Sequence, residues 1–333
     1  MDDAPSTGPA RGSRFAVQRS LKWLSDLGRP PIAEWRGPSL CLADLEKPGL
    51  PPGARIAAAY VAYHPDGGFP DRVGATLEQV DHVYVVDNTP AVNEFAFDGR
   101  VTVVRNMRNA GVGAAFDQAA SRASADGFDY LLLMNQQDAP RAGMVDALLD
   151  GIRRWPGRAA IIAPVRADRN MGLRYTPEDR GRIWPVLAAG AAGSLLDLRA
   201  YEGSGPFRVD LFIDQVDHEY CLRLRRNGYD IVQTGDAVVE TELGSGSPHT
   251  VAGLTLVTTG HSPLRRYYIT RNRLIVAREY PDFPQYRRIA RDWTIREIRN
   301  VILFEKRRPA KLFMAARGVW DYLRGKTGPL KGG

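Results

Sequence analysis

Four stretches between residues 55 and 138 decide the fold: RIAAAYVAYHPD (55–66), HVYVVDN (82–88), VTVVRN (101–106) and YLLLMNQQD (130–138). Each holds a mostly apolar run of strand length, and a clear helical pattern, AGVGAAFDQAASRASADG at 110–127, separates the last two. The helix MVDALLDGIRRW (144–155) and the strand AAIIAPV (159–165) continue the alternation. Strands that alternate with helices in this way indicate βαβ units. The sequence therefore predicts an α/β fold whose sheet is mostly parallel and flanked by helices.

Polar side chains stand at the ends of three of these strands. They are His64 and Asp66, then Asp87 and Asn88, then Gln136, Gln137 and Asp138. One such residue alone is typical of a turn or a helix cap. In open α/β sheets, however, ligands bind outside the carboxyl ends of the strands. Three clusters at equivalent strand ends therefore predict one shared binding site.

The composition is that of a soluble globular protein. The chain has 333 residues, 44% hydrophobic and 25% charged, which is enough for one large domain or two smaller ones. Its 2 cysteines, Cys41 and Cys221, are too few for a disulfide framework and indicate a reduced, cytoplasmic protein. The N-terminus lacks the apolar segment of a signal peptide, and the longest nearly apolar stretch, VLAAGAAGSLL (186–196), is too short to span a bilayer.

Charge is divided unevenly along the chain. The net charge is +7, and the segment from residue 286 to the end alone holds 13 basic and 4 acidic residues, so the rest is close to neutral. A nucleic-acid-binding protein would carry basic residues around a groove in its body, so we exclude that class. Ile289, Trp293 and Ile298 recur at helical spacing between basic residues. This pattern is typical of a helix on an anionic membrane surface, and packing against the rest of the protein explains it equally well.

These patterns divide the chain into three regions. Residues 1–54, rich in proline and glycine, form an N-terminal extension that is partly irregular. Residues 55–275 form the α/β domain, and residues 276–333 form a basic amphipathic helical region. We expect a protein that is peripheral on the inner face of the cell membrane.

The segment RNAGVGAAFDQAA (108–120) carries candidate ligand contacts at the start of a helix. Small residues at Gly111 and Gly113 let a ligand approach the backbone, Asn109 precedes them, and helix N-terminal amides favour anions. The segment has neither the GxGxxG spacing of a dinucleotide-binding fold nor the lysine of a P-loop. Both of those classes are therefore excluded.

Acidic residues crowd the start of another helix, in LFIDQVDHEYCLRLRRNGYDI (211–231). Asp214, Asp217 and Glu219 stand where acidic groups interact favourably with a helix dipole, so capping explains them. The alternative is a general base, a carboxylate fixed at a helix start that takes a proton from an incoming hydroxyl. The residues alone leave both interpretations open.

Taken in order, the segments resemble family 2 inverting glycosyltransferases of the GT-A fold, and among them the bacterial rhamnosyltransferases. The matching segments are YVAYHPD (60–66), VVDNTP (85–90), NAGVGAAFDQA (109–119), LLLMNQQDAP (131–140), AAGSLLDL (191–198), PFRVDLFIDQVDHEYCLRLRRNGYDI (206–231) and HSPLRRYYITRN (261–272). They extend over roughly two thirds of the chain. The resemblance implies a GT-A-type nucleotide-diphospho-sugar transferase fold, followed here by the amphipathic helical segment.

The resemblance also implies which residues bind the nucleotide-sugar donor. Asp87 and Asn88 contact the nucleotide base or ribose, and Asn109 and Gly111 line the diphosphate side. The other implied donor contacts are Tyr63, Gln136, Gln137, Asp138, Gly193, Ser194, His261, Arg265 and Arg266.

A divalent cation, Mg²⁺ or Mn²⁺, is implied as a cofactor. Relatives hold it with an Asp-any-Asp motif after the fourth strand, where this chain has Gln136, Gln137 and Asp138. Asp138 is then the implied ligand and His261 a second candidate, unless His261 and the neighbouring arginines contact the diphosphate directly. Thr241 stands where relatives often have a metal-binding histidine, so we expect weak, water-rich coordination.

For catalysis the resemblance implies a single displacement that inverts the anomeric carbon. Asp217, six residues before Arg223, is the implied general base, Glu219 takes the next acidic position, and Asp214 is a nearby alternative. The base removes the proton of the acceptor hydroxyl, whose oxygen attacks the anomeric carbon as the nucleoside diphosphate leaves.

The implied reaction belongs to cell-surface polysaccharide or cell-wall synthesis. The first candidate donor is dTDP-L-rhamnose, followed by UDP-galactofuranose or another UDP-sugar, and the acceptor is a saccharide, free or polyprenyl-linked. A different class stays open, a catalytically silent relative that binds a nucleotide sugar or a partner enzyme, because of Gln136 and Thr241. Retention of Asp138, Asp217 and Glu219 favours an active hexosyltransferase.

Overall fold

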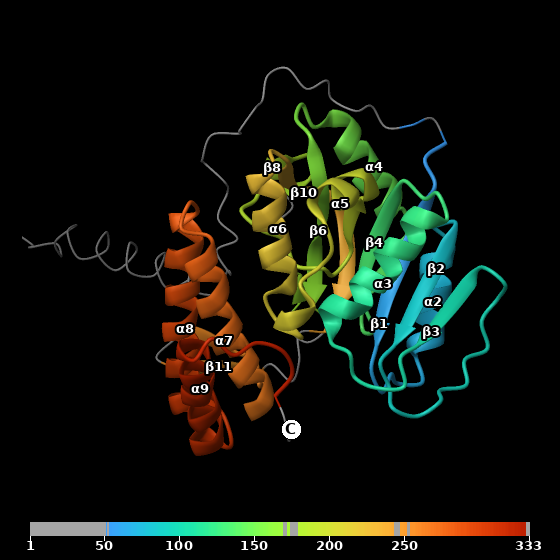
Figure 1. The fold of residues 1–333 in the computed structure, drawn as a ribbon. Helices are drawn as coiled ribbons and strands as arrows, with labels where there is room; N and C mark the ends of the chain where they lie inside the picture. The colour runs from blue at the N-terminus through green and yellow to red at the C-terminus, as the bar shows by residue number, and fades with distance from the viewer. Residues whose placement is uncertain are drawn as a thin grey trace, which may run out of the picture.

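A mixed sheet forms the centre of the molecule. The computed structural model describes residues 51, 53–168, 172–173, 179–242, 247–251 and 254–330, so the predicted N-terminal extension and Cys41 lie almost entirely outside the described residues. Within that part, ten strands form the sheet, with the order β3-β2-β1-β4-β9-β6-β10-β5 along its main path (Figure 1).

The half of the sheet that comes first in the chain is parallel, as predicted. β1 (Ile56–Ala62) lies between β2 (His82–Asp87) and β4 (Tyr130–Asn135), and β3 (Val101–Arg105) flanks β2. Ala62 pairs with Asp87 and Val61 with Asn135, so β1, β2 and β4 end at one edge. The polar residues that follow these three strands are therefore gathered at that edge.

The second half of the sheet contains one reversed strand that the sequence did not predict. β9 (Ser194–Asp197) runs antiparallel to both of its neighbours, β4 and β6 (Ala159–Asp168), whereas β10 (Asp230–Thr241) runs parallel to β6. Short antiparallel strands complete it: β5 (Ala139–Pro140) and β8 (Ile183–Pro185) on β10, and β7 (Gly172–Leu173) on β6. Because β9 is reversed, it begins near the edge where β4 and β6 end.

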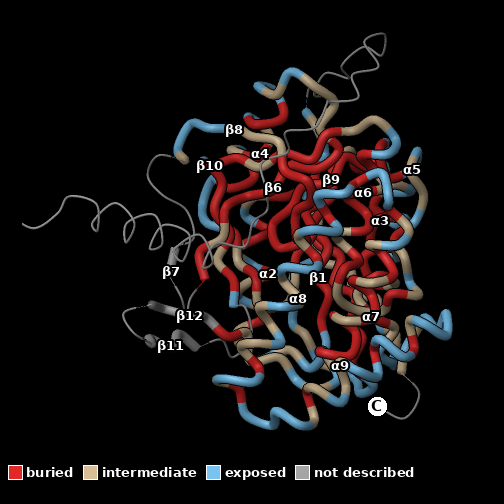
Figure 2. Tube along the Cα trace, turned by 90° about the vertical axis from the view of Figure 1, so that its left-hand side faces the viewer, coloured by how far each residue is buried: buried red, intermediate tan, exposed pale blue. Residues whose placement is uncertain are grey.

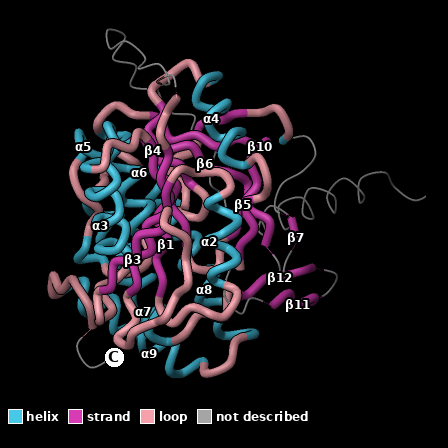
Figure 3. Tube along the Cα trace, turned by 90° about the vertical axis from the view of Figure 1, so that its right-hand side faces the viewer, coloured by secondary structure: helices cyan, strands magenta, loops and turns pink. Residues whose placement is uncertain are grey.

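Helices cover both faces of the sheet (Figures 1 and 3). One face carries α3 (Val112–Ala125), α5 (Leu198–Ser204) and α6 (Val216–Arg226), and the other carries α2 (Phe69–Leu77) and α4 (Met144–Arg154). Side chains alternate along β1, as they must in a strand. Ala57 and Ala59 join the core that contains Phe116 of α3, whereas Ala58 joins the core that contains Phe69 of α2.

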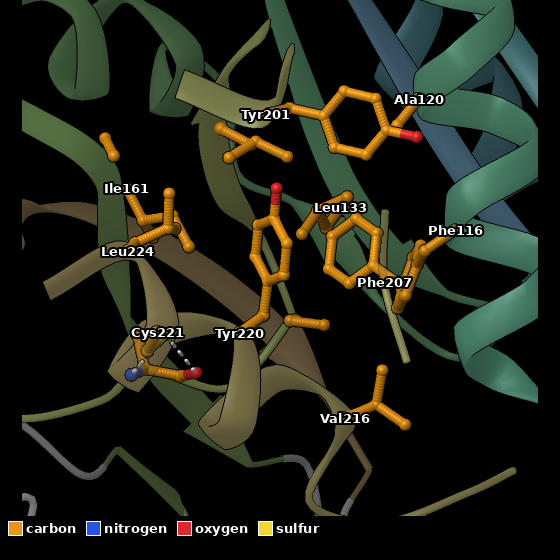
Figure 4. Close-up of a cluster of buried hydrophobic side chains, with 14 of the residues drawn as sticks. Phe116, Ala120, Leu133, Ile161, Tyr201, Phe207, Val216, Tyr220, Cys221 and Leu224 are labelled. Atoms are coloured by element: carbon orange, nitrogen blue, oxygen red, sulfur yellow. Dashed lines mark hydrogen bonds between the residues drawn. The ribbon is translucent and has the colours of Figure 1, made fainter. Parts of the chain in front are cut away.

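The core under α3, α5 and α6 is aromatic. Phe207 stacks on Tyr220 of α6 with ring centroids 4.0 Å apart, and Phe116 of α3 lies 5.9 Å from Phe207 (Figure 4). Cys221 is buried beside Tyr220, and burial raises the pKa of its thiol to about 12, so the thiol stays protonated. Each aromatic pair adds roughly 0.5–1.5 kcal/mol beyond the burial of its area. These contacts fix α6 on the sheet and so fix where its first residues lie.

The last part of the chain is helical. A hairpin of β11 (Ser247–Val251) and β12 (Leu254–Thr258) precedes α7 (Pro263–Glu279), α8 (Pro284–Phe304) and α9 (Arg308–Leu323) (Figure 1). α7 crosses the boundary that we predicted between residues 275 and 276, so the helical region begins earlier. Pro309 lies in the first turn of α9, where proline is tolerated.

The helical region packs on the α/β domain and also exposes apolar side chains. Tyr280 Oη donates to Glu219 Oε1 over 2.6 Å, and Tyr286 Oη donates to Gln215 Oε1 over 2.5 Å. Parts of α8 and α9 are exposed (Figure 2). The large apolar residues exposed on these two helices are Ile295, Ile298, Ile302, Leu303, Phe313, Val319, Trp320 and Leu323. No helix in the described part of the chain is both long enough and apolar enough to cross a bilayer.

Candidate functional site

Asp87 and Asn88 are buried at the end of β2 and shape the loop that follows it. Asp87 accepts hydrogen bonds from Thr89 N over 2.9 Å and from Asn93 Nδ2 over 2.8 Å. Asn88 Nδ2 donates to Gly111 O over 3.2 Å, which ties the end of β2 to the start of α3. The predicted pair is therefore at the expected edge of the sheet. Its hydrogen bonds hold the loop after β2 and the start of α3 in place.

Gly111 meets the loop before α6 at very close range. A Cβ on Gly111 would lie 2.5 Å from Phe212 O, and the residue has a φ of 86°, a conformation that favours glycine. Val112 N donates to the same carbonyl over 2.7 Å. The side chain of the exposed Asn109 accepts from Gly111 N over 3.1 Å. Two segments that are a hundred residues apart in the sequence are thereby joined at the site edge.

Gln136 connects the ends of β1 and β4. Its Oε1 accepts from Tyr63 N over 2.7 Å, and its carbonyl accepts from Arg72 Nε over 2.7 Å. Gln136 and Gln137 are both partly exposed, and the Tyr63 ring is exposed. Tyr63, Gln136 and Gln137 thus form the accessible part of the edge on the β1 side.

Asp138, the predicted metal ligand, is fully buried. Its Oδ2 accepts from Asn135 N over 2.7 Å and from Asn135 Nδ2 over 2.8 Å, and its Oδ1 accepts from Thr241 Oγ1 over 2.6 Å. Burial raises the pKa of the Asp138 carboxyl, an effect that these hydrogen bonds oppose. Thr241, which stands where the resemblance implies a histidine, therefore donates its hydroxyl hydrogen bond to Asp138.

The described residues do not fit a metal ion at this edge. They contain no group of three or more histidine, cysteine, aspartate or glutamate side chains that could hold one. Asp138 already uses both oxygens, and its accessible neighbours Gln136 and Gln137 are amides. The second candidate, His261, lies in the loop before α7 with a neutral imidazole, because burial first and then Arg265 and Arg266 lower its pKa to about 3. A neutral imidazole can bind a metal, but no described cluster of metal-binding side chains includes His261. The predicted metal ligation is thus not supported.

Asp217, the predicted base, lies at the start of α6 and is partly exposed. Its Oδ1 accepts from His218 N over 2.9 Å, and its Oδ2 accepts from Ala191 N over 3.2 Å. Ala191 and Gly193 belong to the loop that leads into β9, and the buried Ser194 is the first residue of β9. Ser194 Oγ donates to Gly190 O over 2.7 Å and so stabilises this loop. The structure therefore brings Asp217 next to the predicted donor-binding residues Gly193 and Ser194.

Arg166 is a site residue that the sequence analysis missed. A Cβ built on Gly190 would lie 1.9 Å from Arg166 Nη2 and 3.3 Å from Asp217 Oδ2, so guanidinium and carboxylate both border Gly190. Arg166 is partly exposed and lies near the end of β6. The available signal was a single arginine directly after the apolar run AAIIAPV (159–165), at the same end as the other polar clusters.

Asp214 forms an ion pair with Arg265. Arg265 Nη2 lies 3.1 Å from Asp214 Oδ1, and Arg265 Nε lies 3.2 Å from Asp214 Oδ2. Asp214 raises the pKa of Arg265, so the guanidinium stays charged. The pair links the loop before α6 to the first turn of α7.

The backbone of the loop before α6 is strained. Phe212, Asp214 and Gln215 have φ angles of 65°, 63° and 68°, each of which costs roughly 1–3 kcal/mol for a residue other than glycine. The buried Asn272 of α7 compensates, since its Nδ2 donates to the carbonyls of Leu211, Ile213 and Asp214 over 2.7, 2.7 and 3.0 Å. The helical region thus holds this loop in place.

Two predicted site residues have structural roles instead. Glu219 is 2% exposed and binds Arg223 and Tyr280, so its carboxylate faces the interface with the helical region. Arg266 is 4% exposed and forms ion pairs with Glu305 at 2.9 Å and with Glu297 at 3.0 Å. Sequence position alone could not show that these side chains point away from the edge. We therefore remove Glu219 from the reacting groups and Arg266 from the donor contacts.

Comparisons with known proteins place this geometry in context. No family model matches the chain. The chain is 32% identical over 89 residues to the dTDP-rhamnosyl transferase RfbF of Shigella flexneri, a match that covers 27% of this chain and 29% of RfbF. The aligned part is therefore less than a third of that relative.

Solved structures match over most of the chain. A crystal structure of S. aureus TarS residues 1–349 in complex with UDP-GlcNAc has a TM-score of 0.53 at 10% identity, with 81% of each chain covered. Another crystal structure of S. aureus TarS has a TM-score of 0.50 at 12% identity and covers 76% of this chain and 44% of that chain. At such identities the likeness shows the fold alone. The chain has the GT-A-type glycosyltransferase fold, as the resemblance in its sequence implied.

Proposed function

We propose that the chain is a glycosyltransferase that moves a sugar from a nucleotide-diphosphate donor to a saccharide or polyprenyl-linked acceptor. The first candidate donor is dTDP-L-rhamnose, and a UDP-sugar such as UDP-galactofuranose is the second. The GT-A-type fold and the 89-residue similarity to dTDP-rhamnosyl transferase RfbF support this class. The observation that carries the proposal is the Asp217 carboxylate, fixed at a helix start by two backbone N–H groups beside a guanidinium.

Asp217 is the general base in the proposed reaction. Two backbone N–H donors hold its carboxylate at the start of α6, where it can accept a proton from a bound hydroxyl. It takes the proton of the acceptor hydroxyl while the acceptor oxygen attacks the anomeric carbon and the bond to the nucleoside diphosphate breaks. A single attack of this kind inverts the anomeric configuration.

Arg166 offsets the charge that develops on the leaving nucleoside diphosphate. A fixed cation near the developing charge lowers the barrier because it needs no reorganisation during the reaction. Arg166 is the candidate for this task because its guanidinium borders Gly190, in the loop that leads to the predicted donor contacts Gly193 and Ser194. Because the described residues do not fit a metal ion, no step in this mechanism is routed through one.

Nucleotide binding tests the proposal directly. We expect dTDP to raise the thermal stability of the full chain more than UDP or GDP, because dTDP is the nucleotide of the first candidate donor. A ligand at 100 times its Kd adds about 2.7 kcal/mol, which is enough to rank the three nucleotides. The same shift should persist in excess EDTA, and Arg166→Gln should reduce it. Arg154→Gln, which alters an exposed ion pair on α4, is the matched control and should leave the shift unchanged. Failure of every nucleoside diphosphate to stabilise the chain would contradict a donor site.

A catalytically silent relative is the alternative class. Gln136, which stands where relatives have the first acid of the motif, favours this class, as does the buried Asp138, whose carboxylate is hydrogen-bonded to Asn135 and Thr241. Nucleotide binding without hydrolysis or transfer of any candidate donor sugar would identify it. Slow release of free sugar from dTDP-L-rhamnose would instead identify an active enzyme.

A further inference from the structure

A basic groove lies between α7 and α8, outside the site described above. Its volume is about 760 Å³, and Tyr322 of α9 also lines it. Its lining contains Arg273, Arg278, Arg287, Arg288 and Arg291, and no aspartate or glutamate among the described residues. We propose that this groove binds the phosphate headgroup of an anionic phospholipid and so seats the protein on a bilayer.

The arginines of the groove carry positive charge that the described residues leave largely uncompensated. Arg287 and Arg288 are exposed, and neither makes a hydrogen bond or an ion pair with another described side chain. Arg278 lies over the Tyr322 ring, with its guanidinium carbon 5.0 Å from the ring centroid. Arg291 pairs with its neighbour Asp292 at the surface. Phosphate is the complementary ligand, since guanidinium groups bind it through two parallel hydrogen bonds.

Arg273 gives the groove a buried polar group. It is 5% exposed and shares the Glu297 carboxylate with Arg266, so one acid serves two guanidinium groups. Its Nε has no hydrogen-bond partner among the described residues. Arg273 therefore adds a cation to the lining that its shared carboxylate compensates only in part.

The rest of the lining favours a lipid over a free anion. Leu274, Ala277 and Pro284 form apolar parts of the wall, and Ile295, which is 60% exposed, continues it toward the surface. α8 and α9 also expose further large apolar side chains. A site that combines guanidinium groups with apolar walls matches a headgroup and the start of its acyl chains, whereas inorganic phosphate needs no apolar wall.

Vesicle binding of the full chain tests this inference. The probe is phosphatidylcholine vesicles with and without phosphatidylglycerol, and binding is measured by co-sedimentation. Arg287→Gln with Arg288→Gln removes two groove charges, and Lys306→Gln with Arg307→Gln removes two charges from the turn between α8 and α9. One basic residue near the headgroups changes partitioning about fivefold, so the groove variant should bind roughly 30-fold more weakly and the control variant less than about fivefold. If both variants lose vesicle binding equally, the groove is not a specific binding site and the proposal is wrong.

Two further arms separate the remaining explanations. Arg287→Lys with Arg288→Lys keeps the charge but not the paired donors, so it should bind more weakly than the wild type; equal binding contradicts a phosphate site. Release of the wild type by inorganic phosphate, beyond chloride of the same ionic strength, identifies a free anion as the ligand and overturns the lipid. A change of oligomeric state in the groove variant identifies a second copy as the occupant. Donor hydrolysis should stay unchanged in all of these variants, so failure here is distinct from failure of the proposed function.

Discussion

At the residue scale, the position of Asp217 leads to the sharpest prediction. Asp217→Asn keeps the shape of the side chain but removes its basicity, so we expect turnover to fall about 100-fold or more. Nucleotide affinity should stay close to that of the wild type, because the proton moves only when the acceptor attacks. Single-turnover transfer and nucleotide titration measure the two quantities separately.

Asp214→Asn and Glu219→Gln are the controls for that experiment. Asp214 binds Arg265, and Glu219 binds Arg223 and Tyr280, so both changes should act mainly on stability. If Asp217→Asn keeps its turnover while one of these variants loses it, the base belongs to the residue that fails.

Sequence patterns located the polar residues of the site better than they assigned their roles. Asp87 and Asn88 lie at the predicted edge and Asp217 lies at the predicted helix start, because strand ends and helix starts can be read from local pattern. The burial of Asp138 could not be predicted from local sequence. The position of its side chain depends on a hydrogen bond from Thr241, which lies 103 residues further along the chain. Arg166 was missed for the same reason, because its neighbour Gly190 is distant in the sequence.

At the scale of secondary-structure elements, the contact between the start of α3 and the loop before α6 is open to test. Gly111→Ala places a Cβ 2.5 Å from a backbone oxygen at a φ of 86°, so we expect a loss of more than about 1 kcal/mol of folding free energy. Gly74→Ala is the matched control: Gly74 is exposed within α2 with nothing near its Cβ position, so alanine should stabilise by roughly 0.5–1 kcal/mol. Urea unfolding of both variants gives the comparison, and equal effects would contradict the close contact.

The strands were more predictable than their directions. Alternating strands and helices led correctly to the parallel half of the sheet. β9 was not foreseen as antiparallel, because the segment AAGSLLDL contains no signal for direction. Its reversal depends on the turn at Gly193, which has a φ of 71° and donates to Leu133 O over 2.9 Å. Such tertiary contacts decide what local sequence leaves open.

At the scale of the whole molecule, His218 couples folding to pH. Burial, the largest effect, lowers its pKa; Asp217 opposes this, while Arg166 and Arg273 add to it. The unfolded chain therefore takes up the proton first, and the stabilisation is present above a pH of about 6.5 and is lost as the pH falls. His218→Gln should flatten the loss of stability on acidification by up to about 1.4 kcal/mol per pH unit. Urea unfolding between about pH 7 and pH 5 measures both slopes; parallel slopes would refute the coupling.

Asn272 also bears on how this protein can be recombined with its relatives. Its three hydrogen bonds cross from α7 to the loop before α6 and hold a strained backbone there. A chimera that takes its sheet from one parent and its last three helices from another would keep these bonds only if both parents place that side chain alike. We therefore expect the two regions to be inherited as one unit, with new specificities arising by substitution inside it rather than by shuffling its parts.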